Sequence, residues 1–125
     1  MKEQGNIRVL IVDDNESMQV LTKTILKKCD YIADVAVNGE DMVRKYDQNE
    51  YDILLVDLQM PVMDGIEATS IIRRKELDNN KKTPIIAVTG SEILLEHQAR
   101  KLGFDACLPK PYSREKLLEV VKRFC

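Results

Sequence analysis

Short apolar runs alternate along the chain with longer stretches in which apolar side chains recur at helical spacing. The runs are apolar on both faces, which is typical of strands buried in a parallel sheet. They lie at Val9–Val12, Ile53–Val56, Ile85–Val88 and Ala106–Pro109, with a shorter candidate strand near Ala33–Val37. Helical periodicity follows each strand, over 16–28 and 91–101 and around Met42–Tyr46, Ile66–Arg73 and Leu117–Phe124. Five such units in series predict an α/β fold: one parallel sheet with right-handed crossovers and helices on both faces.

Residues that start or stop helices fall at the expected boundaries. Asp14 or Asn15 can cap the helix over 16–28. Within that segment the apolar residues Met18, Leu21 and Ile25 recur at helical spacing. Gly103 is the expected left-handed residue after the fourth helix. No linker or repeat interrupts the pattern, so we predict a single domain over residues 1–125 with its core at about 7–124.

Composition narrows the class of protein. The chain has 125 residues, 44% of them hydrophobic, and a net charge of −2, which argues against a nucleic-acid-binding module. No apolar stretch approaches the ~20 residues of a membrane span, and the polar segment 1–6 lacks the apolar core of a signal peptide. We therefore expect a cytoplasmic domain without membrane contact. Cys29, Cys107 and Cys125 form no CxxC pair, which fits reduced thiols better than a disulfide or zinc site.

Four strands are followed by side chains that can handle a metal ion or a phosphoryl group. Asp13 and Asp14 follow the first strand, Asp57 the third, Thr89 the fourth and Lys110 the fifth. Ligands of open α/β sheets bind outside the carboxyl ends of the strands, so these groups should converge at one edge. The Asp13–Asp14 pair by itself could be only a helix cap, but Asp57 after a separate apolar strand has no such explanation.

Convergence of these groups implies a specific chemistry. Three carboxylates brought together repel one another unless a cation lies among them, and Mg²⁺ suits such a set of oxygen ligands. Asp57 could then attack phosphorus to give an aspartyl phosphate. Lys110, held between two prolines, and the hydroxyl of Thr89 could contact the phosphoryl oxygens. If each residue is considered alone, Lys110 is better interpreted as a surface lysine in a loop. Thr89 is then better interpreted as a residue that hydrogen-bonds the local turn.

The motifs at these strand ends resemble those of receiver domains of two-component response regulators. The matching stretches are Val12–Asn15, Asp57–Gly65, Val88–Gly90 and Leu108–Pro111. The resemblance covers nearly the whole chain. It implies a flavodoxin-like (βα)5 fold whose five strands run in the order 2-1-3-4-5, with two helices on one face and three on the other. It also implies function in a phosphorelay rather than as a classical enzyme.

By this resemblance the metal site would hold Mg²⁺. Asp14 and Asp57 would bind the ion directly, Asp13 largely through a water molecule, and the backbone carbonyl of Gln59 would complete the protein ligands. Asp57 would also be the phosphoacceptor.

The resemblance assigns the phosphoryl contacts as well. Thr89 and Lys110 would touch the phosphoryl group, and the Lys110–Pro111 peptide would be cis. The donor would be a phosphohistidine of a histidine kinase or histidine phosphotransfer domain, or a small acyl phosphate. The output partner would use the face of the fourth helix, fifth strand and fifth helix, where Tyr112 could add an aromatic contact, and the domain would be a monomer or weak dimer.

Two details refine this interpretation. The stretch Asp57–Thr69 is most similar to receivers of hybrid sensor histidine kinases, although stand-alone regulators carry similar sequences. The family often has Tyr or Phe as a switch residue three positions before the lysine, and here that position is Cys107.

Other interpretations remain open from the sequence. A phosphatase of the haloacid dehalogenase type would also form an aspartyl phosphate, but it needs a second Asp where Gln59 stands. A degenerate receiver that binds partners without phosphate would not be expected to keep the full set of site residues. His97 lies in a polar helical stretch and is interpreted as a solvated surface residue.

Overall fold

Five parallel strands form one sheet in the order β2-β1-β3-β4-β5 in a computed structural model of the chain, which describes residues 4–58, 64–90 and 96–125. This is the order that the family resemblance implied. The strands are β1 (Arg8–Val12), β2 (Ile32–Ala36), β3 (Ile53–Asp57), β4 (Ile85–Thr89) and β5 (Ala106–Pro109).

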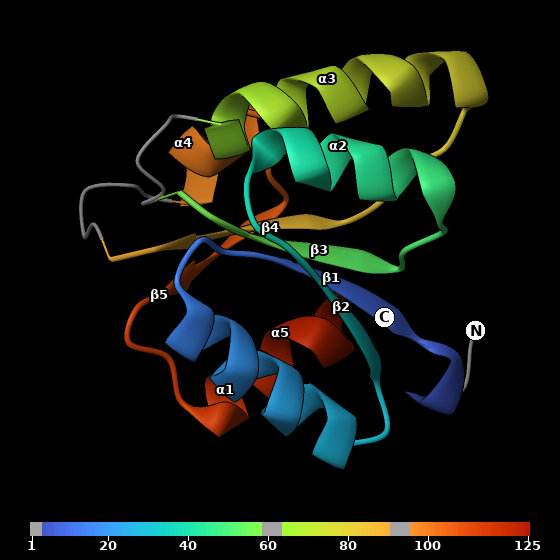
Figure 1. The fold of residues 1–125 in the computed structure, drawn as a ribbon. Coiled ribbons are helices and arrows are strands. Elements are labelled where there is room, and N and C mark those ends of the chain that lie inside the picture. The colour runs from blue at the N-terminus through green and yellow to red at the C-terminus, as the bar shows by residue number, and fades with distance from the viewer. Residues whose placement is uncertain (1–3, 59–63, 91–95) are drawn as a thin grey trace.

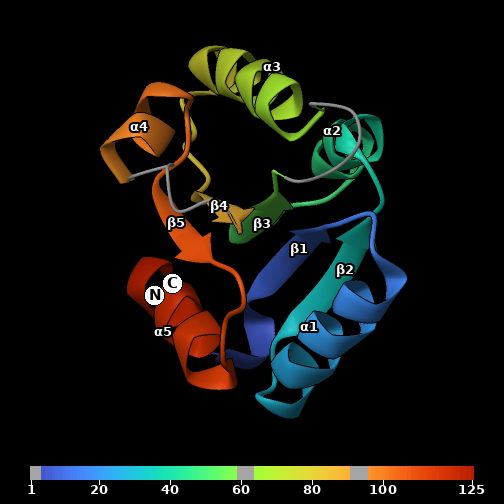
Figure 2. The same ribbon diagram turned by 90° about the vertical axis from the view of Figure 1, so that its left-hand side faces the viewer.

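Helices cover both faces of the sheet, as the alternation of strands and helices predicted. Figures 1 and 2 show α1 and α5 on one face and α2, α3 and α4 on the other. The helices are α1 (Glu16–Lys28), α2 (Gly39–Gln48), α3 (Asp64–Asn79), α4 (Glu96–Lys101) and α5 (Arg114–Phe124), and a 3-10 turn, η1 (Gln4–Asn6), precedes β1. Side chains of Asn15, Asn38 and Ser113 cap α1, α2 and α5, each by accepting a hydrogen bond from a backbone N–H of the first turn.

Each face of the sheet has its own hydrophobic core. In β3, Ile53 and Leu55 pack toward α1 and α5, whereas Leu54 and Val56 pack toward the opposite helices. All five residues of β3 are buried. Burial on both faces is why this strand is apolar throughout instead of alternating with polar residues.

Three sequence predictions can be compared directly with the helices and strands. Asn15, one of the two proposed caps, does begin α1, and Gly103 has the expected positive φ of 102°. The apolar spacing of α1 is only partly matched, because Ile25 packs against the core whereas Leu21 is 49% exposed. The fully buried positions of this helix are Thr22 and Leu26. Helical spacing alone left this rotation open, since apolar residues occur on both sides of the helix.

The second strand is also shifted from its predicted range. It covers Ile32–Ala36, so Val37 falls outside it. The N–H of Val37 donates to the carboxylate of Asp41, which places Val37 in the turn that starts α2. The predicted start of the fourth helix at residue 91 lies outside the described residues.

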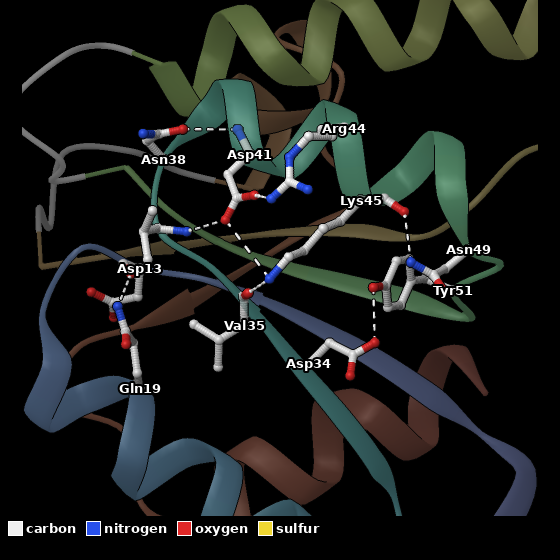
Figure 3. Close-up of polar contacts among 11 residues, drawn as sticks. Asp13, Gln19, Asp34, Val35, Asn38, Asp41, Arg44, Lys45, Asn49 and Tyr51 are labelled. Atoms are coloured by element: carbon white, nitrogen blue, oxygen red, sulfur yellow. Dashed lines mark hydrogen bonds and ion pairs between the residues drawn. The ribbon is translucent and has the colours of Figure 1, made fainter.

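A lysine covers part of the free edge of the sheet at β2. Lys45 of α2 donates a hydrogen bond to the carbonyl oxygen of Val35 and also lies 3.8 Å from the carboxylate of Asp41 (Figure 3). A charged side chain over an edge strand disfavours pairing with another chain.

Candidate functional site

Three carboxylates meet at the carboxyl ends of β1 and β3. One oxygen atom from each of Asp13, Asp14 and Asp57 lies within 4.8 Å of the others. Asp13 and Asp57 are 4% and 3% exposed, while Asp14 is exposed. The sequence prediction that these residues converge is confirmed in the structure.

Backbone pairing holds the first of these side chains in place. The N–H of Asp13 continues the β1–β2 ladder by donating to the carbonyl of Ala36 at 3.1 Å. Its carboxylate accepts the N–H of Asn15 at 2.8 Å. Its carbonyl accepts the side-chain amide of Gln19 at 2.6 Å (Figure 3). Asp13 is therefore fixed from both the sheet and α1. The sequence prediction missed Gln19, whose position one turn into α1 was the available signal.

Lys110 reaches the same cluster from the end of β5. Its ammonium nitrogen lies 2.9 Å from Oδ2 of Asp57, and its backbone N–H donates to the carbonyl of Thr89 at 2.8 Å. The peptide bond between Lys110 and Pro111 is cis, as the family resemblance implied. One ammonium against three carboxylates leaves a formal excess of two negative charges, which matches the charge of one divalent cation.

The pKa of Asp13 reflects this crowding. Burial raises the pKa of its carboxyl above the ordinary value, and the charge of Asp57 acts in the same direction, whereas the hydrogen bond from Asn15 opposes both. A bound cation would favour the ionised form and relieve the repulsion. Carboxylate oxygens at this spacing are the donors that Mg²⁺ prefers, so the described residues fit that ion.

Thr89 is the last residue of β4 and lies beside the acidic cluster. The β3–β4 register pairs Asp57 with Val88, and the β4–β5 register pairs Thr89 with Pro109. Thr89 is 4% exposed and Gly90 after it is exposed. The three predicted phosphoryl-handling residues thus lie at the carboxyl ends of three neighbouring strands: Asp57 ends β3, Thr89 ends β4 and Lys110 directly follows β5.

Close packing explains why position 65, at the end of the Asp57–Gly65 motif, is a glycine. A Cβ atom there would lie 2.9 Å from Cγ1 of Val56 and 3.2 Å from the carbonyl oxygen of Asp57. The close approach lets α3 begin directly against the end of β3.

A partly buried polar pair beside the site was not predicted from the sequence. The hydroxyl of Tyr112 and Oγ1 of Thr22 are 2.6 Å apart. They border a cavity of about 10 Å³ that Asp13 and Asp57 also line, a volume close to that of one water molecule. The sequence prediction gave Tyr112 only a role in partner contact.

Several predicted residues have other placements. Cys107 is half-buried in β5, pairs with Ala87 and packs beside the core under α2, α3 and α4. Gln59, the proposed carbonyl ligand, lies outside the described residues, and so does the side chain of His97. Across the described ranges, no helix combines the length and apolar character needed to cross a membrane.

Comparisons with known proteins identify a family. A family model described as the response regulator receiver domain matches residues 9–122. The hybrid signal transduction histidine kinase G of Dictyostelium discoideum is 38% identical over 123 residues, which cover 94% of this chain and 4% of that protein. The chemotaxis protein CheY of Halobacterium salinarum is 36% identical over 114 residues, which cover 91% of this chain and 92% of that protein. The chain therefore spans a small part of the first relative and nearly all of the second.

Solved structures agree with this result. The receiver domain of sensor histidine kinase PA1611 from Pseudomonas aeruginosa, with a magnesium ion coordinated in its active site cleft, aligns with a TM-score of 0.83 and 30% identity over 94% of this chain and 96% of that one. A second match comes from the co-crystal structure of the Saccharomyces cerevisiae histidine phosphotransfer protein Ypd1 and the receiver domain of the response regulator Ssk1. It has a TM-score of 0.85 and 29% identity over 94% of this chain and 88% of that chain.

Proposed function

This chain belongs to the family of response regulator receiver domains of two-component signalling systems, and we propose that Asp57 is the residue on which it accepts a phosphoryl group. The observation that carries the proposal is the contact of 2.9 Å between Lys110 and Asp57 within a cluster of three carboxylates. A buried carboxylate with an adjacent fixed ammonium and a metal-binding neighbourhood is arranged to attack phosphorus.

The transfer itself makes one bond and breaks another. A carboxylate oxygen of Asp57 bonds to phosphorus while the bond from phosphorus to the imidazole nitrogen of the donor breaks. The imidazole keeps the electron pair of that bond and takes up a proton. Lys110 stays beside the new acyl phosphate and neutralises part of its charge, and Thr89 donates its hydroxyl hydrogen to another phosphoryl oxygen. The reaction needs no catalytic group from another enzyme.

Asp13 and Asp14 would hold Mg²⁺ together with Asp57, and we assign the carbonyl of Gln59 as a further ligand. When bound, the ion supplies positive charge to the phosphoryl oxygens. Support comes from the carboxylate spacing and from the magnesium-bound receiver of PA1611. The chain's own contribution is to hold Asp13 rigidly through Asn15 and Gln19 so that the acidic site is formed before the ion arrives.

The phosphoryl donor is proposed to be a histidine kinase or a histidine phosphotransfer domain. The aligned receiver of Ssk1 was crystallised with such a phosphotransfer protein. The output partner would bind the face formed by α4, β5 and α5. The domain would work in the cytoplasm, either at the end of a hybrid sensor kinase or as a separate regulator. The family match favours this function over the phosphatase alternative.

Intact-mass measurement after incubation with acetyl phosphate tests the proposal. We expect one phosphoryl adduct on the wild-type chain with Mg²⁺ present and none when the ion is chelated. Asp57→Asn should remove the adduct without unfolding the protein, while Asp52→Asn serves as a control at the opposite end of β3. An adduct on Asp57→Asn at the wild-type level would show that the assignment is wrong.

A further inference from the structure

A groove with a strongly positive lining lies near the amino-terminal ends of β4 and β5. Asp57 lies at the opposite, carboxyl ends of the strands. The volume of the groove is about 570 Å³. The charged lining residues in the described structure are Arg73, Lys82, Arg100, Arg123 and Asp105. Four cations thus face one carboxylate, although the chain as a whole has a net charge of −2.

The floor of the groove is a fixed polar network around Arg73. Its guanidinium group donates to the carbonyl of Gly103 at 2.8 Å, to Asp105 at 2.8 Å and to buried Glu76 at 2.5 Å. Asp105 also accepts the N–H of Ile85 at 2.9 Å. The single carboxylate of the lining is therefore engaged within the wall.

The remaining cations lie toward solvent. Lys82, 3.3 Å from Asp105, keeps 73% of its side chain exposed. Arg100 and Arg123 are exposed in the last turns of α4 and α5. The guanidinium of Arg123 lies over the ring of Phe124 at 4.9 Å, which limits its orientations. Cations are common at helix C-termini, but Lys82 lies outside any helix and extends the positive surface beyond that effect.

A second groove adjoins the first and adds an apolar element. It has a volume of about 510 Å³, shares Arg73 and Lys82, and is also lined by Arg74, Lys81, Leu77 and Glu76. The carboxylate of Glu76 is 5% exposed and accepts a hydrogen bond from Arg73, so it is engaged within the wall as Asp105 is. Leu77 is 83% exposed, the highest value among the exposed large hydrophobic residues of the described chain. An apolar side chain at the margin of a cationic surface suits a ligand that carries both carboxylates and an apolar group.

We propose that these two grooves together bind an acidic segment of a partner protein, with carboxylates beside Lys82, Arg100 and Arg123 and an apolar side chain on Leu77. The positive lining complements such a segment, and the two grooves together exceed the reach of a single small anion. Single-stranded nucleic acid is disfavoured because its bases stack on exposed aromatic rings. In this lining Phe104 is buried and Phe124 is covered by Arg123.

Fluorescence anisotropy with a labelled peptide of Asp and Glu around a pair of leucines tests the proposal. We expect binding that weakens as salt rises, and loss of binding when the acidic residues are replaced by Asn and Gln. Arg100→Glu/Arg123→Glu should weaken binding by about tenfold or more. The matched control, Lys27→Glu/Lys28→Glu, makes the same charge change in the last turn of α1 and should alter affinity by less than about twofold.

Two further variants and two competing ligands complete the test. Lys82→Glu repeats the experiment at an exposed loop position and should also weaken binding. Asp57→Asn should bind the peptide as the wild type does, because the grooves lie at the opposite ends of the strands from Asp57. Weaker binding by that variant would overturn the proposed location. Equal affinity for the Asn/Gln peptide, or tighter binding to single-stranded RNA or to phosphatidylglycerol vesicles, would overturn the proposed class of ligand.

Discussion

The hydroxyl group of Tyr112 lies 2.6 Å from Oγ1 of Thr22, which joins the segment after Lys110 to the inner face of α1. Thr22 is 1% exposed, and burial raises the pKa of Tyr112, so its hydroxyl stays protonated near neutral pH. The pair borders the small cavity beside Asp13 and Asp57. This contact is thus a further polar link between α1 and the proposed phosphoacceptor site, besides the hydrogen bond from Gln19 to the carbonyl of Asp13.

Removal of either hydroxyl should destabilise the protein. Tyr112→Phe leaves Oγ1 of Thr22 buried without this partner, at a cost of about 1–2 kcal/mol in the free energy of unfolding. Thr22→Val should cost a similar amount. The double variant should lose less than the sum of the two, because neither polar group then remains. Urea unfolding of all four proteins measures the coupling, and strictly additive losses would show that the contact contributes nothing.

The carboxylate cluster should lower the stability of the metal-free protein. Asp13→Asn or Asp57→Asn removes one of three like charges whose repulsion is opposed in part by the ammonium of Lys110. We expect a gain of about 1 kcal/mol, or roughly 4 °C in Tm, for either variant without Mg²⁺. The additional gain on adding Mg²⁺ should be smaller than in the wild type. Calorimetry with and without the ion is the measurement, and unchanged or lower metal-free Tm values in both variants would contradict a shared cluster.

The same repulsion should depend on pH. The pKa of Asp13 is raised in the folded state above its ordinary value of 3.8, so between these two values the folded protein binds more protons than the unfolded chain. The destabilising contribution is therefore absent below pH 3.8, grows as pH rises from 3.8 to the raised folded-state pKa, and is fully present above it. The Tm advantage of Asp13→Asn over the wild type should grow in the same direction, and an advantage that stays constant across this window would contradict the argument.

The residues at the strand ends could be predicted from the sequence, but the rotation of α1 about its own axis could not. Asp57 and Lys110 each follow an apolar run, and parallel pairing brings such positions together without knowledge of any side-chain packing. The contact between Thr22 and Tyr112 depends instead on the orientation of α1. The helical spacing of apolar residues included Leu21, whereas the structure exposes Leu21 and buries Thr22. A difference of one residue in rotation therefore concealed a polar neighbour of the site.

Arg73 should be far more important for stability than its neighbour Arg74. Arg73→Leu leaves the carboxylate of Glu76 buried at 5% exposure with the N–H of Thr83 as its remaining hydrogen-bond donor among those described. Breaking a buried ion pair from one side typically costs about 3 kcal/mol or more. The exposed Arg74→Leu control should change the free energy of unfolding by less than about 0.5 kcal/mol. Guanidinium chloride unfolding distinguishes them, and equal effects of the two variants would show that the network is not stabilising.

Cys107 should not act as a moving switch when Asp57 is phosphorylated. It occupies the position where the family often has an aromatic ring, but its side chain is small, apolar and half-buried beside the core under α2–α4. Thr89 can still move toward the phosphoryl oxygens, and backbone displacement after β4 would then carry the signal. We expect Cys107→Ala to keep phosphorylation-dependent partner binding within about twofold of the wild type. Structures with and without a beryllofluoride mimic should show the same Cys107 rotamer. A large inward rotation of Cys107, or loss of phosphorylation-dependent binding in Cys107→Ala, would mean that the thiol does replace the ring.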